Sequence, residues 1–203
     1  MADTKMSWAI RPLEFSQTTA TGKPQSASSI RNMAADHEAA HAVVGIRLEM
    51  KLVKIDIAQR RVTLSTGEQA LSQGFTRYDV ADLEAVEGLT EVLLRRILFA
   101  AAPIIVEKQR DADVPDVCRD DIAGVRRWSA PLGLTSSQTA DVLAWAANTA
   151  YEILTADGGH AWRSVAAELQ KHRFLSPAKV VSLVRDSDQR WNRQIASEAQ
   201  PNG

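Results

Sequence analysis

Helical and strand-like patterns of apolar residues alternate along this chain, and the helical ones dominate. Residues 30–50 are rich in Ala, Met, Leu and Val and contain no Pro, which predicts a helix. In residues 53–57 and 62–64 apolar and polar side chains alternate, which is the period of a strand buried on one face. A long helical pattern follows over residues 80–109. We therefore predict an α+β protein that is mainly α-helical, with a small β-sheet beside the first helix.

The C-terminal half carries start and stop signals for four further helices. The first is predicted over residues 121–128. The spacing of Thr135 and Gln138 is that of a capping box, which predicts the start of the second. The last two are predicted at residues 160–172 and after the Ser-Pro pair at residues 176–177. Together they predict a C-terminal helical bundle.

The two ends of the chain differ from its centre. Residues 15–29 are small and polar, and cannot bury much apolar area. We therefore divide the 203-residue chain into a partly flexible N-terminal arm at residues 1–29, a folded domain at residues 30–196 and a flexible tail at residues 197–203. At this length one domain buries a sizeable core, and nothing requires a second.

Composition and charge exclude two broad classes of partner. The formal net charge is −1, so no global positive field attracts nucleic acid or an anionic membrane surface. The longest strongly apolar run, residues 97–106, is too short for a helix that spans a bilayer, which takes roughly 20 residues. Cys118 is the single cysteine, which excludes an internal disulfide and suits a reducing compartment. We therefore expect a cytoplasmic protein that binds neither nucleic acid nor membranes.

Residues 37–41 read His-Glu-Ala-Ala-His and lie inside the first predicted helix. Histidines four positions apart share one face of a helix, so His37 and His41 can both reach one tetrahedral cation. Zinc lowers the pKa of its water toward about 7, and a carboxylate beside it can take the proton and pass it to a leaving amine. The motif therefore predicts a zinc site at His37 and His41, with Glu38 as the general base of amide hydrolysis.

A catalytic zinc needs a third protein ligand, and the residues near the motif do not supply it. The positions three and six residues after His41 hold Val44 and Arg47, so the extended three-histidine motif is absent. Glu68, the acidic residue at the distance of a two-His, one-Glu site, falls in a glycine-flanked loop. The third ligand is therefore expected further along the chain. The alternative is a metal-free helix whose two histidines form hydrogen bonds at the edge of the core.

The sequence around the motif resembles the FtsH-type zinc peptidase domain. In that family the helix reads HEAGHA and runs into a strand, as residues 35–44 and 53–57 do here. Residues 120–125, Asp-Asp-Ile-Ala-Gly-Val, are similar to the family's N-D-L-x-x-A segment, in which the Asp before Leu is the third zinc ligand. The resemblance therefore implies that Asp121 is the third ligand. From the residues alone an N-cap role for Asp121 remains open, and so do three alternative ligands nearby, Asp120, Asp116 and Cys118.

The resemblance spans residues 34–185 and implies a zinc-dependent metallopeptidase. Two residues depart from the family pattern. Ala40 replaces a Gly, and Val106 replaces the first of two Glu residues, which removes a carboxylate that can orient the ligands. The strand predicted at residues 53–57 is either a peptide-binding edge beside the zinc or a purely structural edge.

The family's proteases also carry a membrane anchor and an ATPase, and the sequence shows neither an apolar spanning segment nor a G-x-x-x-x-G-K-[ST] loop. We therefore expect the substrate to be a peptide or an unfolded protein, with a separate unfoldase or a dedicated protein partner. The alternative function is a catalytically weak or inactive zinc-binding module of the same fold that acts in protein–protein interaction.

Overall fold

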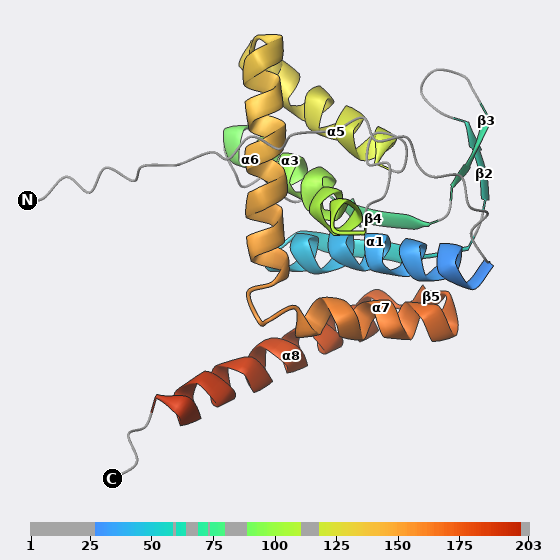
Figure 1. Cartoon of the computed structure of the whole chain (residues 1–203), viewed down its shortest axis with the longest axis vertical. Helices are drawn as coiled ribbons and strands as arrows, with labels where there is room; N and C mark the ends of the chain where they lie inside the picture. Colours follow the sequence, from blue (N-terminus) through green and yellow to red (C-terminus); the bar gives the residue numbers. More distant parts are fainter. Residues whose placement is uncertain are drawn as a thin grey trace, which may run out of the picture.

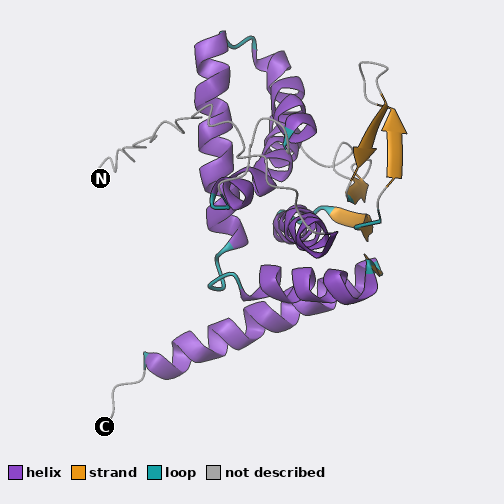
Figure 2. Ribbon diagram, turned by 45° about the vertical axis from the view of Figure 1, so that its right-hand side comes forward, coloured by secondary structure: helices purple, strands orange, loops and turns teal. Residues whose placement is uncertain are grey.

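The computed structural model describes residues 27–58, 60–63, 69–72, 74–79, 89–110 and 118–199. In these ranges the chain is mainly helical with a small antiparallel sheet (Figures 1 and 2), which confirms the predicted α+β, mainly α fold. In chain order the elements are α1 (Ala27–Arg47), β1 (Lys51–Asp56), β2 (Arg60–Thr63), β3 (Gln69–Ser72), β4 (Phe75–Asp79), α3 (Leu89–Lys108), α5 (Arg119–Ser129), the 3-10 helix η1 (Ala130–Leu132), α6 (Ser136–Leu154), α7 (His160–His172), β5 (Phe174–Leu175) and α8 (Pro177–Glu198).

The predicted helices are present in the described ranges, with small shifts at their ends. The helix predicted over residues 80–109 corresponds to α3, and residues 80–88 of that prediction lie outside the described ranges. α1 begins at Ala27, inside the arm predicted at residues 1–29, of which residues 1–26 lie outside the described ranges. α8 reaches Glu198, inside the predicted tail. The capping box at the start of α6 is confirmed: the side chain of Thr135 accepts from the backbone N–H of Gln138, and the Gln138 side chain accepts from the backbone N–H of Thr135.

α3 continues as one helix from Leu89 to Lys108 although Pro103 lies inside it. The sequence predicts a kink or a new helix at this position, because proline lacks the N–H that donates to the carbonyl four residues earlier. Residues 100–107, on both sides of Pro103, are all buried, so packing against the rest of the protein stabilises the helix here. Packing therefore outweighs the missing hydrogen bond.

The sheet has the strand order β4-β1-β5 and is antiparallel, while β2 and β3 form a separate pair. β1 pairs with β4 along its whole length, and with β5 at Ile55 and Asp56. The strand predicted at residues 53–57 therefore falls on the central strand β1. It is an edge of neither kind, which corrects both of its expected roles, as a peptide-binding edge and as a structural edge. Of the strand predicted at residues 62–64, residues 62 and 63 lie in β2, which pairs with β3, and residue 64 lies outside the described ranges. The two terminal strands of the sheet are β4, whose sequence has no clear alternation, and the two-residue strand β5.

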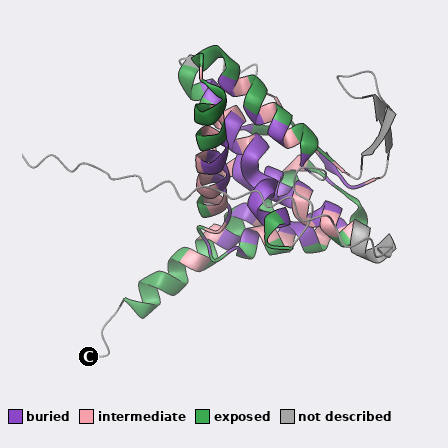
Figure 3. Cartoon of the chain, turned by 45° about the horizontal axis from the view of Figure 1, so that its top comes forward, coloured by how far each residue is buried: buried purple, intermediate pink, exposed green. Residues whose placement is uncertain are grey.

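α1 lies at the centre of the molecule, with α3 and β4 on one side and α7 on the other (Figure 1). Ala35, Ala39 and Ala42 have no exposed surface, and such small side chains allow neighbouring elements to approach closely. Buried residues concentrate on α1, α3, α6 and α7, whereas the end of α8 is exposed (Figure 3). No helix in the described ranges has the length and apolar character needed to cross a bilayer.

Candidate metal centre

The predicted zinc ligands come together where α1 meets the start of α5. Nε2 of His37 lies 3.2 Å from Oδ2 of Asp121, and Nε2 of His41 lies 3.0 Å from Oδ1 of the same carboxylate. Asp121 lies in the first turn of α5, where the helix dipole favours a negative charge. One carboxylate from a distant segment thus faces both imidazoles of the helix motif.

The other ring nitrogen of each histidine contacts α3. Nδ1 of His41 lies 2.9 Å from the backbone oxygen of Phe99, and Nδ1 of His37 lies 3.3 Å from Oε1 of Glu107. A carbonyl oxygen only accepts, so Nδ1 of His41 carries a proton and donates it. In a neutral imidazole Nε2 is then an acceptor. It faces the carboxylate oxygen of Asp121, which is a second acceptor.

This contact between two acceptors needs a positive charge, either a second proton on the ring or a metal ion. Burial alone would lower the pKa of His37, but the Asp121 carboxylate and hydrogen bonds to Asp121 and Glu107 raise it well above its ordinary value. Burial would raise the pKa of Asp121, but the charges of His41 and His37 hold it well below its ordinary range. A divalent cation can replace these protons, since metal binding to histidine and carboxylate releases them.

Glu38, the predicted general base, is buried against β4. Oγ1 of Thr76 donates a 2.7 Å hydrogen bond to Oε2 of Glu38, and lies 3.2 Å from its backbone oxygen. A Cβ atom at Gly74 would lie 2.5 Å from Oε1 of Glu38, so only glycine allows the chain to pass this close. Burial raises the pKa of Glu38, against the opposing effects of His37, His41 and Thr76. A carboxyl group with a raised pKa is well suited to take and return a proton near neutral pH.

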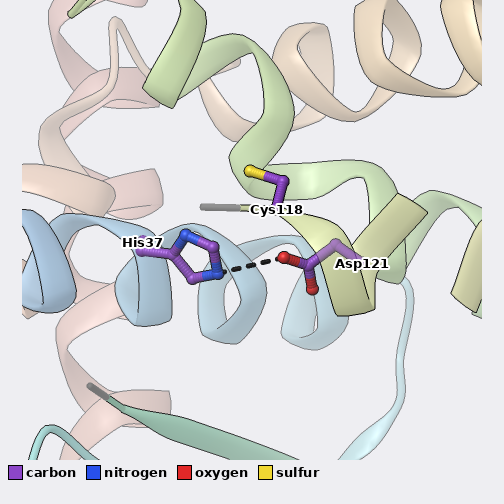
Figure 4. A group of neighbouring side chains, drawn as sticks. All are labelled: His37, Cys118 and Asp121. Carbon is purple, nitrogen blue, oxygen red and sulfur yellow. Dashed lines mark ion pairs between the residues drawn. The ribbon is translucent and has the colours of Figure 1, made fainter. Parts of the chain in front are cut away.

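Of the alternative ligands in the described ranges, Cys118 is the one that groups with His37 and Asp121. It directly precedes α5, and the ligand atoms of His37, Cys118 and Asp121 all lie within 4.8 Å of one another (Figure 4). Cys118 is fully buried, and burial together with the carboxylates of Asp121 and Glu107 raises the pKa of its thiol. Asp120 is exposed on α5, and Asp116 lies outside the described ranges.

Three groups at this site are not predicted from the sequence: the Glu107 side chain, the Phe99 carbonyl and the Thr76 side chain. Glu107 is the second residue of the Glu pair in the family pattern, so an orienting carboxylate is present although Val106 replaces the first. Its signal is a single acidic side chain that directly follows an apolar run. Oε2 of Glu107 is buried without a hydrogen-bond partner in the described residues. A backbone carbonyl and a lone threonine carry no comparable signal.

Comparison of the chain with protein-family models and with curated proteins finds no match to either. The resemblance to the FtsH-type peptidase domain therefore stays a prediction that depends on the two ligand segments.

Proposed function

We propose that this chain is a zinc-dependent metallopeptidase that hydrolyses peptide bonds. His37, His41 and Asp121 are the proposed metal ligands and Glu38 the general base. The observation that carries the proposal is the position of the Asp121 carboxylate, which faces Nε2 of both histidines at 3.0 and 3.2 Å.

The donor set suits zinc in number and in type. Two imidazole nitrogens and one carboxylate oxygen are common ligands of catalytic zinc, and three protein ligands leave one position for the reactants. The Nδ1 contacts of His41 to Phe99 and of His37 to Glu107 direct both Nε2 lone pairs toward Asp121. Such outer contacts are typical of metal-binding histidines, because they fix the tautomer and the ring orientation. The residues present therefore fit the metal.

Zinc, when bound, polarises the peptide carbonyl and makes water acidic enough to attack at neutral pH. Glu38 is the side chain that would accept and return the proton. Thr76 orients the Glu38 carboxylate through Oε2, and this carboxylate would take the proton from the attacking water and return it to the departing amine. The raised pKa of Glu38 makes its carboxylate a stronger base, which favours the first of these two proton transfers.

The substrate class follows from the strand beside Glu38. β4 is one of the two terminal strands of the sheet and carries Thr76, which contacts Glu38. An extended peptide that added to β4 by backbone hydrogen bonds would lie beside the general base. A peptide or an unfolded segment can adopt this conformation, whereas a folded protein needs to be opened first. We therefore propose peptides or unfolded protein as substrates, supplied by a separate unfoldase or a dedicated partner.

The test combines metal content with peptide cleavage. We expect about one zinc per chain in the wild type and in Glu38→Gln, and its loss in His37→Ala. Cleavage of an unstructured peptide should fall about 100- to 10,000-fold in Glu38→Gln, because the general base is removed while the metal stays. His172→Ala is the matched control, since His172 is exposed at the end of α7 and should affect neither readout. A wild type that stays metal-free after zinc addition would contradict the proposal.

The second candidate function is a zinc-binding module with weak or no turnover that acts in protein–protein interaction. The position of Cys118 favours it, because a further ligand within 4.8 Å of His37 and Asp121 can close the metal to reactants. Zinc binding without any activity that depends on Glu38 would support this alternative.

A further inference from the structure

Two pairs of ligand-type residues face each other across the metal centre. Cys118 and Asp121 are three positions apart at the start of α5, and a spacing of two intervening residues is common among zinc ligands. His37 and His41 form the second pair, four positions apart on α1. Figure 4 shows His37 and Asp121 facing each other, with the Cys118 side chain beside this contact.

We propose that Cys118 is a fourth ligand and that it closes the metal held by His37, His41 and Asp121. This inference rests on the metal site of the proposed function. Four protein ligands complete the tetrahedral set of a closed zinc site, whereas a catalytic site keeps one position open. The protein therefore rests in a latent form, and turnover requires Cys118 to leave the metal.

The geometry is close to what the bond requires. Ligand atoms on a tetrahedral zinc lie about 3.5 Å apart, given bonds of about 2.0 to 2.3 Å to nitrogen, oxygen and sulfur. The ligand atoms of His37, Cys118 and Asp121 all lie within 4.8 Å of one another, so a shift of roughly 1 to 1.5 Å brings the sulfur to ligand spacing from His37 and Asp121. Thiolate is also a preferred zinc ligand.

The exchange of ligands is balanced in atoms and charge. When the metal binds, the S–H bond of Cys118 breaks, its proton passes to water, and a bond forms between Sγ and the metal. When the site opens, that bond breaks, the thiolate takes up a proton from water, and the oxygen of a second water occupies the vacated position. No oxidant or reductant takes part.

Cobalt in place of zinc gives a readout that is independent of activity. We expect the cobalt-loaded full chain to show sulfur-to-cobalt charge-transfer absorption in the near ultraviolet, and Cys118→Ala to lose it while it keeps the weaker visible bands and one bound metal. Cys118→Ser serves as a second, closely isosteric variant. We also expect zinc-loaded Cys118→Ala to cleave peptides faster than the wild type. Absence of a Cys118-dependent charge-transfer band in the wild type would overturn the proposal.

The outcomes separate this inference from the proposed function. A thiolate band without Glu38-dependent cleavage in either the wild type or Cys118→Ala supports the closed site and overturns the peptidase. Glu38-dependent cleavage without the band supports the peptidase and overturns the fourth ligand. A chain that binds no cobalt and no zinc overturns both.

A second inference rests on an independent contact, between α3 and His41. In a helix the N–H of each residue donates to the carbonyl four positions earlier, and Pro103 has no N–H for the carbonyl of Phe99. That carbonyl instead accepts from Nδ1 of His41 at 2.9 Å. We infer that Pro103 is a positioning residue, which reserves the Phe99 carbonyl for His41 and so leaves Nε2 of His41 for the metal.

Pro103→Ala restores the competing N–H without removing any side chain from the site. In the metal-free protein, at a pH where the imidazoles are neutral, we expect nitrogen NMR shifts to report a smaller fraction of His41 with its proton on Nδ1. Zinc affinity should fall about tenfold, at the lower end of the usual cost of a lost outer contact. His37 is the internal control, because its contact with Glu107 does not involve Pro103. An unchanged His41 tautomer together with unchanged zinc affinity would overturn the inference.

Discussion

Two buried polar clusters lie along α1, and they differ in how their charges are balanced. The first is the metal centre around His37, His41 and Asp121. The second, which we name the Arg47 cluster, joins Arg47 at the end of α1 to Asp157, Ser187 and Asp188. Both connect α1 to helices from the C-terminal half, so both can contribute to stability. They do not use their polar groups in the same way.

In the Arg47 cluster hydrogen-bond donors face hydrogen-bond acceptors. Asp157 is almost fully buried and accepts hydrogen bonds from the backbone N–H groups of Gly159 and Ala161 and from Oγ of Ser187, at 2.7 to 3.0 Å. Nη2 of Arg47 lies 3.2 Å from Asp157. Its Nη1 donates to the backbone oxygens of residues 153 and 154, at the end of α6. The chain itself satisfies this cluster.

In the metal centre acceptors face acceptors, and Oε2 of Glu107 is buried without a partner in the described residues. A buried cluster left in this state is costly unless a cation completes it. The comparison therefore indicates that the chain itself satisfies the Arg47 cluster, whereas the candidate metal centre needs a proton or a cation to balance its acceptors. Substitutions in the two clusters should affect different measurements.

The largest effect on stability is expected from Asp157→Ala. Without the Asp157 carboxylate, the backbone N–H groups of Gly159 and Ala161 and the Ser187 hydroxyl lose their buried acceptor, and Arg47 keeps only Asp188 as an ion-pair partner among the described residues. Together these losses cost about 3 kcal/mol or more of the free energy of unfolding. Asp188→Ala is the matched control, because Asp188 contacts the same Arg47 from a half-exposed position and should cost less than about 1 kcal/mol. Denaturant unfolding measures both. Zinc content should stay unchanged in both variants. A loss of zinc in Asp157→Ala would contradict the expectation that the Arg47 cluster affects stability without affecting metal binding.

The same variant has an expected signature in pH. Burial would raise the pKa of Asp157, but hydrogen bonds from Ser187 and Ala161 and the charge of Arg47 outweigh it and lower the pKa. A carboxylate with a lowered pKa stabilises the folded protein above the pKa of the unfolded chain, about 3.9. This contribution is lost as the pH falls through the folded pKa. The stability difference between wild type and Asp157→Ala should therefore be constant at neutral pH and shrink below about pH 4.

An intermediate effect, on metal binding instead of stability, is expected from Glu107→Gln. The neutral amide is a weaker acceptor for Nδ1 of His37, and loss of such an outer contact typically costs about 10- to 100-fold in metal affinity. The unfolding free energy of the metal-free protein should change little. Glu91→Gln, on the exposed face of the same helix, is the control for competition titrations with a zinc chelator. If Glu107→Gln lowers the free energy of unfolding and leaves zinc affinity unchanged, Glu107 contributes to stability, as the Arg47 cluster does, and not to metal binding.

The parts of the fold and site that depend on local spacing could be predicted, and those that depend on long-range contacts could not. The motif at residues 37–41 and the caps of α6 and α8 depend on residues within one turn of helix, so the sequence alone indicates them. β4 is stabilised by β1 and α1, and not by a pattern of its own, which is why no strand was predicted there. Asp121 was assigned through a family resemblance and not through chemistry, because one acidic helix start resembles another.

The contacts around the ligands are the hardest part to predict, because some involve the backbone. The Phe99 carbonyl has no side-chain signature, and Pro103 suggests only a break in the helix when it is considered by itself. The two become meaningful together, once α3 is placed against α1 and His41 lies 2.9 Å from the carbonyl. A sequence pattern can therefore indicate metal ligands, but the atoms that orient them depend on the packing of separate helices.

The smallest effect is expected from Thr76→Val, which removes a hydroxyl but keeps the shape of the side chain. The hydroxyl donates to Oε2 of Glu38, and the loss of one such bond costs about 1 kcal/mol, which corresponds to about fivefold in a rate. Since the bond holds the general base and not a metal ligand, we expect kcat for peptide cleavage to fall while KM and zinc content stay the same. Thr76→Ser keeps the hydroxyl and should restore kcat. If Thr76→Val instead lowers stability and leaves kcat unchanged, the hydrogen bond between Thr76 and Glu38 contributes to stability alone, and Thr76 has no part in the proposed reaction.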